Sequence, residues 1–350
     1  MNRFHNSVTC RLLIAVWLIS CGCGFVEAED RVSYRPEGAT SVFILVGEIV
    51  SSTGQELEIR PTGGVPVRIP ITNVVEVQTH YDPDHLAGIE LFRAGRIEEA
   101  IDALHAGLER EPRNWVDREI LAWLVRCHLR QNDEIAALND FRQIVLSDPY
   151  TRHWGLAPME WLPRQVNHPL SQSAKSLLVD TRPGLRLLGA SLLLFDPELS
   201  TTARREMDDL CKNLNSHIAD LARAQMWRVA LANREVTRDR LQRWHDQIDD
   251  LPAELRPGPQ YLLAKGYQQL GFPRLAAAEY LKLTILYSDN EALTARATLE
   301  AADALQETGL TQGASVLYRE LLTRFPESNA AKNAPASSTA NQAAPSEATQ

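Results

Sequence analysis

The sequence predicts a mainly α-helical protein: an α-solenoid of helical hairpins preceded by a small antiparallel β-barrel-like module. Three observations lead to this prediction. Short β-branched segments fill residues 41–79, apolar residues recur at helical spacing from Asp82 onward, and a 34-residue pattern repeats within the helical part. With 350 residues, 44% hydrophobic and 23% charged, the chain has the composition of a globular protein of two or three folding units.

Residues 1–28 have the pattern of a signal peptide. Two arginines precede an apolar run at residues 12–19, and the segment ends in Val26-Glu27-Ala28, with a small residue at the expected cleavage site. The run is shorter than the roughly 20 residues that a permanent membrane helix needs. We therefore expect an exported chain that begins at Glu29, has no transmembrane span, and lies in the periplasm or cell envelope. The sequence around Cys21 also resembles a bacterial lipobox, so acylation of Cys21 and a lipid anchor are the alternative.

The mature chain is acidic. Removing Arg3 and Arg11 from the 36 basic residues and Glu27 from the 45 acidic ones leaves 34 against 44, a net charge of about −10. Nucleic acid binding requires a dense basic face, and the sequence has no such cluster. We therefore expect no nucleic-acid partner.

The β module is predicted at residues 29–80. The sequence contains four β-branched or apolar segments, 42–50, 57–59, 65–69 and 74–77, and turns that contain glycine, at 53–54 and 62–64, separate the first three. We expect four or five strands in a small barrel. In size and strand rhythm the segment is similar to the SH3-like or Sm-like modules that precede helical repeats in some exported bacterial proteins. It serves either as a structural cap on the helices or as a binding module.

The helical part begins at Asp82, a suitable N-cap, followed by Pro83 in the first turn. Small and apolar residues then fall at the offsets of a helix-turn-helix repeat, with the small ones where two helices would approach closely. In the first copy these positions are Gly88, Leu91, Gly95, Ala100, Leu104, Gly107 and Pro112. This pattern resembles the tetratricopeptide repeat.

Four copies fit the same template, at residues 81–114, 118–151, 257–290 and 295–328. The second copy departs from it, because Asn132 stands where the other copies have glycine between the helices. The tryptophan typical of the family's first helix is missing from all four. The resemblance tolerates these departures and covers less than half of the chain directly.

The remaining segments are assigned by their composition and periodicity. Amphipathic stripes capped by Ser200 and Thr237 indicate degenerate helical hairpins, whereas a run rich in proline and tryptophan indicates an ordered but irregular insertion. After Ser328 the residues are small and polar, which predicts disorder. The predicted units are a signal peptide at 1–28, a β module at 29–80, repeats at 81–151, the insertion at 152–182, degenerate hairpins at 183–256, repeats at 257–328, and a disordered tail at 329–350.

No group of residues predicts an active site. His80 and His85, with two aspartates between them, are the one cluster of metal-ligand residue types. The histidines straddle a helix start and do not share a helix face, and the aspartates already have a role as caps. The sequence has neither a nucleophile elbow nor a phosphate-binding glycine loop. We therefore expect no enzyme, no metal and no cofactor.

The resemblance to tetratricopeptide repeats implies a scaffold that binds a peptide or a partner protein. In that family the first helix of each pair lines a concave groove. Matching to the template places these residues there: His85, Ile89, Phe92, Arg93, Arg126, Leu129, Arg130, Tyr261, Lys265, Gln268 and Gln269. The Lys and Asn pattern of the family's carboxylate-clamp members is missing at His85 and Ile89.

The arginines of this predicted groove suit an acidic, partly hydrophobic partner segment. Three alternatives stay open. Arg126 and Arg130 could pair with acids of the chain itself, such as Glu119, and be solvated. The helices could be a structural spacer that holds the β module at a distance, or the chain could be an enzyme of an unrecognised kind.

Overall fold

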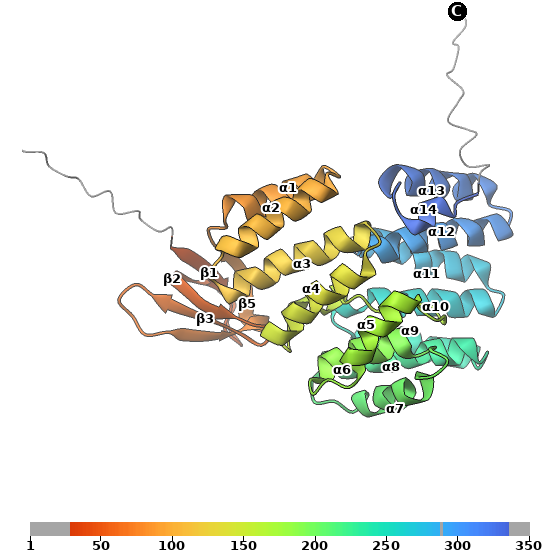
Figure 1. The fold of residues 1–350 in the computed structure, drawn as a ribbon, viewed down its shortest axis with the longest axis horizontal. Helices are drawn as coiled ribbons and strands as arrows, with labels where there is room; N and C mark the ends of the chain where they lie inside the picture. The colour runs from red at the N-terminus through yellow and green to blue at the C-terminus, as the bar shows by residue number, and fades with distance from the viewer. Residues whose placement is uncertain (1–28, 288–289, 336–350) are drawn as a thin grey trace, which may run out of the picture.

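The structure is a computed structural model that describes residues 29–287 and 290–335. It is mainly helical, with a small antiparallel sheet at the N-terminal end (Figure 1). The predicted signal peptide, with Cys21, and residues 336–350 of the predicted tail lie outside the described residues. Within residues 29–287 and 290–335, no helix combines the length and the hydropathy needed to cross a membrane.

The described residues form five strands in one antiparallel sheet with the order β4-β3-β2-β1-β5. Their bounds are β1 (Asp30–Tyr34), β2 (Phe43–Ser52), β3 (Glu56–Pro61), β4 (Val67–Pro70) and β5 (Val74–Gln78). Four of the strands lie in the predicted segments. β1 was not predicted as a strand, yet it pairs with both β2 and β5. The order ends at β4 and β5, so closure into a barrel stays a prediction.

The same residues form fourteen α-helices. Their bounds are α1 (Pro83–Arg93), α2 (Ile97–Arg110), α3 (Asn114–Arg130), α4 (Glu134–Ser147), α5 (His168–Leu178), α6 (Pro183–Leu193), α7 (Ser200–Leu210), α8 (Ser216–Ala232), α9 (Arg238–Asp250), α10 (Pro257–Gln269), α11 (Pro273–Leu286), α12 (Glu291–Glu307), α13 (Thr311–Arg324) and α14 (Asn329–Lys332). Short 3₁₀ turns include η2 (Arg152–Leu156) and η3 (Ala253–Leu255). The helix pairs α1/α2, α3/α4, α10/α11 and α12/α13 overlap the four predicted repeats, although α3 and α12 each start four residues before the predicted bounds.

The helix starts follow local capping chemistry. Asp82 caps α1 through a bond from the Asp84 N–H, 2.8 Å long, and Thr237 caps α9, both as predicted. Ser200 differs from the prediction, since it is the first residue of α7 and makes no side-chain cap bond. The N–H groups in the first turn of a helix have no partner within the helix. Asp82 and Thr237 accept hydrogen bonds from such groups, so α1 and α9 begin at the residues that follow them.

Five of the turns between helices each contain one residue in the left-handed backbone conformation. Its φ is positive in each case, at Gly95, Asn132, Arg234, Gly271 and Gly309. Four of these turns belong to the predicted repeats, and Asn132 takes the place of glycine because asparagine tolerates this conformation. The fifth, Arg234, joins α8 to α9, where the sequence had predicted only a degenerate hairpin. There too the next residue closes the turn, with Glu235 N–H donating to Ala230 O at 2.9 Å.

Replacing Arg234 with glycine is expected to stabilise the protein by about 1 kcal/mol, because a side chain at φ +56° is strained and glycine is not. The Arg234 side chain is exposed, so little packing is lost. Urea denaturation measures the change. Gly271→Arg places an arginine at the equivalent turn, φ +76° with open space around it, and should destabilise by a similar amount. Equal stabilities of wild type and Arg234→Gly would contradict this account.

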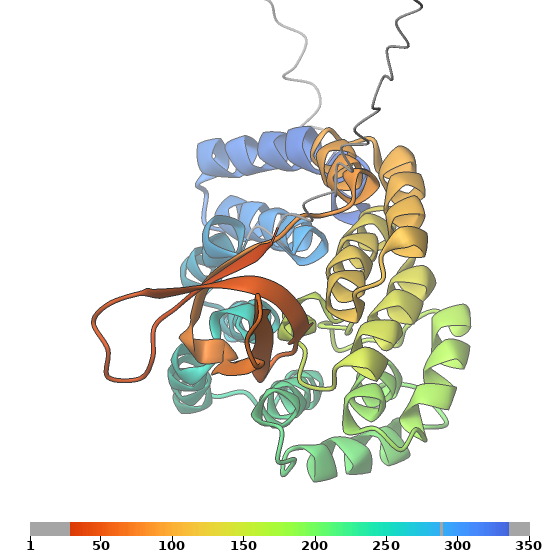
Figure 2. The ribbon, with the colours of Figure 1, turned by 90° about the vertical axis from the view of Figure 1, so that its left-hand side faces the viewer.

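The helices succeed one another around a ring. Figure 2 shows them in chain order from α1 and α2 to the C-terminal helices, which return beside the start of the helical part. Arg130 at the end of α3 forms an ion pair with Glu291 at the start of α12, 3.4 Å apart. The Asn132 side chain donates to Glu327 O at 3.3 Å. We call this junction between the α3/α4 turn and the C-terminal helices the seam.

The sheet lies on one face of the ring and is attached there to α3 and to the end of α4 (Figure 2). Its buried residues, among them Val32 and Ile59, belong to the same apolar cluster as the helices. Gly54, in the β2–β3 turn, donates to Asp148 Oδ2 at 2.8 Å. A Cβ at this glycine would lie 1.6 Å from Tyr150 O, so only glycine allows the approach. Arg118 completes the attachment by donating to Ser52 O.

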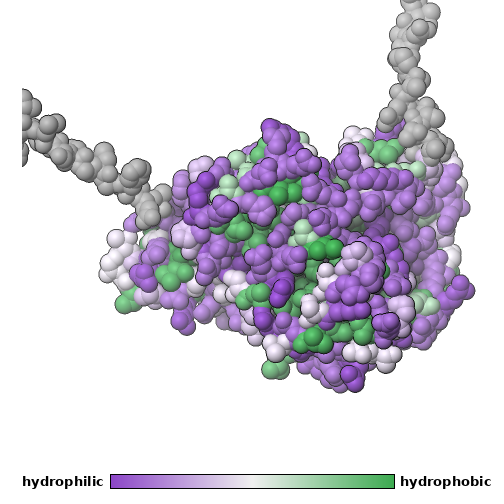
Figure 3. All heavy atoms as spheres, viewed as in Figure 1, coloured by the Kyte–Doolittle hydropathy of each residue, from purple (hydrophilic) through white to green (hydrophobic). Residues whose placement is uncertain are grey.

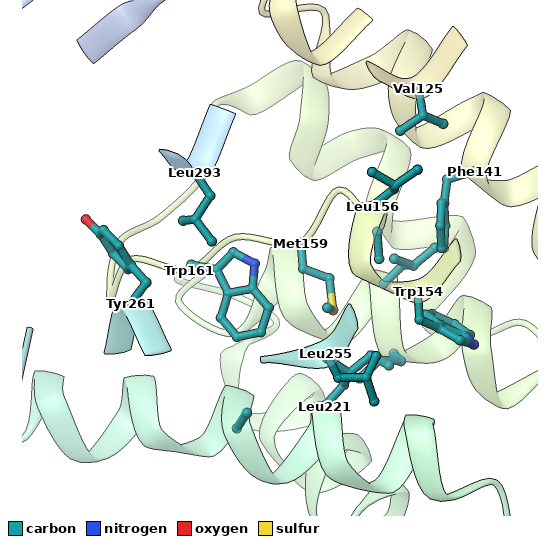
Figure 4. Packing of buried hydrophobic residues seen from close by; sticks show 14 of the residues in the cluster. Val125, Phe141, Trp154, Leu156, Met159, Trp161, Leu221, Leu255, Tyr261 and Leu293 are labelled. Atoms are coloured by element: carbon teal, nitrogen blue, oxygen red, sulfur yellow. The ribbon is translucent and has the colours of Figure 1, made fainter. Parts of the chain in front are cut away.

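The irregular part of the predicted insertion is residues 152–167, which we call the strap. Its apolar side chains point into the interior, as Figure 4 shows for Trp154, Leu156, Met159 and Trp161. Trp161 packs so closely on α10 that a Cβ at Gly258 would lie 2.1 Å from its ring. The strap therefore fills the inside of the ring as part of its core.

Helix side chains hold the backbone of the strap. Asn290 donates to Gly155 O at 3.2 Å, Gln225 to Glu160 O at 3.2 Å, and Arg228 to Leu162 O at 2.8 and 2.9 Å. These donors come from α8 and from the residue before α12. Because buried carbonyls need hydrogen-bond partners, the irregular segment can lie inside the molecule only with such donors.

The rest of the predicted insertion is regular. Residues 168–178 form α5, capped by Asn167, whose side chain accepts from the Leu170 N–H at 2.9 Å. Pro169 and Pro183, which we expected to interrupt helices, lie in the first turns of α5 and α6. A first-turn proline removes an N–H that would have no partner in the helix, so it favours a helix start.

The predicted disordered tail differs from the structure at its beginning, because residues 329–332 form α14. Ala330 and Ala331 are buried against Ala295, Leu321 and Phe325. We therefore expect truncation after Ser328 to lower the free energy of unfolding by about 1–2 kcal/mol, since two buried methyl groups and their backbone are lost. Truncation after Pro335 should leave it unchanged. Denaturation curves of the two truncated chains test this, and equal stabilities would show that α14 contributes nothing.

Candidate functional site

Three of the residues predicted to line a groove are buried. His85, Phe92 and Tyr261 are 2%, 6% and 0% exposed. The His85 ring packs edge-on against Tyr81, with centroids 4.9 Å apart, and burial lowers its pKa. In the part of the chain that the structure describes, neither His85 ring nitrogen has a hydrogen-bond partner. These three side chains are not available to a partner in this conformation.

The predicted groove arginines are engaged within the chain. The Arg126 guanidinium lies 4.6 Å from the centroid of Trp123, and that of Arg130 lies 5.3 Å from Phe92. Both arginines are half-buried, and we had expected them to be exposed. Arg93 is exposed and pairs with Glu90 on the same helix at 2.8 Å.

Glu119, considered above as a partner for these arginines, serves a different contact. It binds Arg152 at 2.7 Å and His153 at 3.1 Å, both in η2 of the strap. Burial alone would raise the pKa of Glu119, but His153 and Arg152 outweigh it and bring the pKa to about 2. Glu119 therefore fixes one end of the strap to α3.

The third repeat presents its predicted groove residues to the neighbouring helices. Lys265 binds Glu300 of α12 at 3.1 Å and also Gln268, while Gln269 donates to Leu231 O at 3.1 Å. Ile89, in the first repeat, is half-buried. The predicted residues thus do not form one concave surface, because most of them pack against or pair with side chains of their own or neighbouring helices. Leu129 and Arg130 alone among them line a common cleft described below.

A cleft of about 960 Å³ lies at the seam, and we call it the seam cleft. One wall is formed by residues 95–99 and 129–134, from the α1/α2 and α3/α4 turns. The other wall is formed by residues 325–330 and Lys332, together with Glu291, Ala292 and Arg296 of α12. In Figure 3 the outline dips between α1–α2 and α13–α14, and the surface on both sides is mostly hydrophilic.

The seam cleft continues inward to the strap. A smaller pocket shares Leu129, Glu134 and Arg296 with it and ends at residues 157–161. There Glu160 is held by Arg164 at 2.9 Å and by Arg296 at 3.4 Å. Burial alone would raise the pKa of Glu160, but these arginines and Arg228 outweigh it, so the pKa is lowered. The inner end of the cleft is thus formed by charged side chains that are held in place by ion pairs.

Sequence reasoning missed the seam cleft. Its walls come from the first, second and fourth repeats, and the bond from Asn132 to Glu327 joins residues 195 positions apart. No local pattern records that the ends of a helical array meet. The one local signal was Asn132, whose departure from the glycine template places a hydrogen-bond donor at this turn.

A titratable pair lies outside the cleft, between α3 and α4. The distance from His128 Nε2 to Asp140 Oδ2 is 3.4 Å. Burial, with a contribution from Asp133, raises the pKa of Asp140 to about 7, and burial lowers the pKa of His128. A carboxyl with a raised folded-state pKa keeps its proton where the unfolded chain loses it, so this group destabilises the fold as the pH rises from about 4 to 7.

Replacing Asp140 with asparagine should therefore stabilise the protein by about 2 kcal/mol at pH 8 and have little effect at pH 4. Urea denaturation at the two pH values measures this difference. Asp102→Asn, at an exposed position of α2, controls for the loss of one negative charge. A stabilisation that is equal at both pH values would contradict the titration of Asp140.

Within the described ranges, no group of three or more His, Cys, Asp or Glu side chains is arranged to hold a metal ion. No family model, no curated protein and no solved structure matches this chain.

Proposed function

We propose that this protein is an exported interaction scaffold of the tetratricopeptide-repeat type, which binds a peptide segment of a partner protein in the seam cleft. The proposed place of action is the periplasm or cell envelope, as the signal-peptide pattern suggests. The repeat pattern, with left-handed turns at Gly95, Asn132, Gly271 and Gly309, supports an α-solenoid. The β module is proposed as a barrel-like cap on one end of it.

The observation that supports this function most is the seam cleft itself. Its volume of about 960 Å³ is at the upper end of the range for ligand pockets, and its mixed polar and apolar walls suit a peptide. The interior of the ring is a less favourable site, because the strap already fills it. A segment that enters the cleft from outside need displace neither Trp154 nor Trp161.

Site-specific photo-crosslinking tests this proposal. A photoreactive phenylalanine analogue at Ile97, which lines the cleft, should cross-link to a partner protein in the cells that make this protein. The control carries the analogue at Leu86, which is 47% exposed on α1 and lies outside the cleft lining. Both variants should melt at the wild-type temperature. Equal cross-linking from the two positions, or none from Ile97, would contradict the proposal and favour the spacer alternative.

A further inference from the structure

We infer that the segment bound in the seam cleft is basic, an extended peptide in which Lys or Arg side chains alternate with apolar ones. This inference rests on the proposed function and specifies the chemistry of the partner. It differs from the acidic partner expected from the sequence. The reason is the distribution of charge in the cleft, taken together with the ion pairs that its residues already form.

The cleft lining has an excess of acid. Six acidic residues line it against four basic ones. The acidic ones are Glu98, Glu99, Asp133, Glu134, Glu291 and Glu327, and the basic ones are Arg96, Arg130, Arg296 and Lys332. The excess alone is small, so what decides the preference is which of these charges remain available.

The three arginines are already neutralised. Arg96 donates to Glu99 at 2.6 Å. Arg130 lies 3.4 Å from Glu291, and Arg296 lies 3.4 Å from Glu160. An incoming carboxylate would have to displace an acid of the chain from each of them. Arg130 is one of the arginines from which the sequence predicted an acidic partner. In the structure its charge is paired with Glu291 across the seam.

The available charges are mainly negative. Glu98 and Glu327 are exposed on opposite walls of the cleft, and among the described residues neither takes part in an ion pair. The Asp133 carboxylate is also exposed there, and among the described residues it accepts only from the N–H of Ala136, at 3.0 Å. Lys332 is the one basic residue of the lining for which the described residues offer no such pair. A bound Lys or Arg side chain could therefore reach a carboxylate on either wall.

Deeper in the cleft, Glu134 also favours a cation. It is half-buried and lines both the cleft and the inner pocket. Burial and the nearby Glu160 raise its pKa, and Arg164 and Arg296 counter only part of this. A ligand ammonium or guanidinium group near Glu134 would relieve that repulsion. A second carboxylate at the same place would increase it.

Apolar residues lie between the acids. Ile97 and Leu129 on one wall are half-buried, and Pro326 on the other is exposed. In an extended peptide successive side chains point to opposite sides, so apolar side chains can contact Ile97 and Leu129 while the basic side chains between them reach Glu327 on the other wall. The walls thus match a peptide in which the two kinds of residue alternate.

Fluorescence anisotropy with the full mature chain tests the inference. The probes are two labelled peptides of about ten residues with equal leucine and alanine content, one carrying lysines and the other glutamates at the same positions. The lysine peptide should bind at least about tenfold more tightly, and its binding should weaken when NaCl rises from about 50 to about 300 mM. Equal binding of the two peptides, or no binding of the lysine peptide, would overturn the inference.

A matched pair of variants separates the cleft from the overall negative charge. Glu98→Gln with Glu327→Gln should weaken binding of the lysine peptide at least about fivefold. Asp102→Asn with Glu109→Gln changes the net charge equally at exposed positions of α2 outside the cleft lining and should leave binding within about twofold. An equal loss in both double variants would reduce the binding to unspecific attraction and overturn the inference.

The two proposals can fail separately. If the analogue at Ile97 cross-links a partner whose cross-linked segment has no excess of Lys and Arg, the scaffold function stands and the basic partner is wrong. If no cross-link forms at Ile97 while the lysine peptide binds and the cleft variant abolishes that binding, the cleft has the inferred preference and the scaffold function fails.

Discussion

Replacing Arg228 with methionine is expected to lower the free energy of unfolding by about 3 kcal/mol. The Arg228 side chain is fully buried, and its guanidinium donates to Leu162 O, to Ser191 O and to Gln225 Oε1. Methionine leaves Leu162 O and Ser191 O without this donor, at roughly 1–3 kcal/mol each, whereas Gln225 Oε1 still accepts from the Ser191 hydroxyl at 3.0 Å.

The loss in free energy of unfolding should be smaller than the summed contributions of these hydrogen bonds. Burial lowers the pKa of Arg228 to about 10, which means that the buried cation itself costs free energy that the variant no longer incurs. Arg243→Met, at an exposed position of α9, should change stability by less than about 0.5 kcal/mol. Urea denaturation compares the two. Similar stabilities of the two variants would mean that the strap does not depend on Arg228.

Trp154→Ala is expected to cost about 3–5 kcal/mol, because the indole fills the space between the strap and α4 and would leave a cavity. Trp154 is 1% exposed, and its ring centroid lies 5.4 Å from that of Phe141 in an edge-on contact. A Cβ at Gly184 of α6 would lie 2.9 Å from the ring, so α6 also packs directly against the indole. The surrounding helices have little freedom to collapse into the space.

Trp154→Phe should cost much less, about 1–2 kcal/mol. Among the described residues the buried indole N–H has no acceptor, so phenylalanine removes volume without breaking a hydrogen bond. Thermal and urea denaturation of both variants measure the difference. A phenylalanine variant as unstable as the alanine variant would show that the indole N–H does find a partner, such as a buried water.

The features that the sequence predicted are those determined over short distances. Gly88 and Ala100 mark a close helix crossing, and a Cβ at Gly88 would lie 2.6 Å from Leu104 Cγ, so the repeat pattern has a steric cause within one hairpin. The α8/α9 turn escaped the template because Arg234 gives no signal of a positive φ. β1 was missed because its five residues carry too little alternation, although two strands pair with it.

The predicted groove failed for a different reason. A repeat template places Tyr261 on a helix face, but it cannot tell what covers that face. Here the cover comes from the neighbouring helices, since the Tyr261 ring lies 5.5 Å from that of Tyr280 in α11 and its hydroxyl donates to Glu300 of α12 at 3.2 Å. The prediction that Arg130 binds an acidic partner failed likewise, because Arg130 pairs with Glu291 at the start of α12, far away in the sequence.

The closed seam has a consequence for how the chain folds. In an open stack of repeats each unit contacts only its neighbours, so unfolding proceeds gradually from the free ends. Here the second repeat contacts the fourth, and the bond from Asn132 to Glu327 joins residues 195 positions apart. Such a contact forms late, because its loop-closure entropy is offset only when the intervening hairpins are already in place. The N-terminal repeats therefore reach their final native contacts only after the last helices have been synthesised. The array should unfold as one cooperative unit.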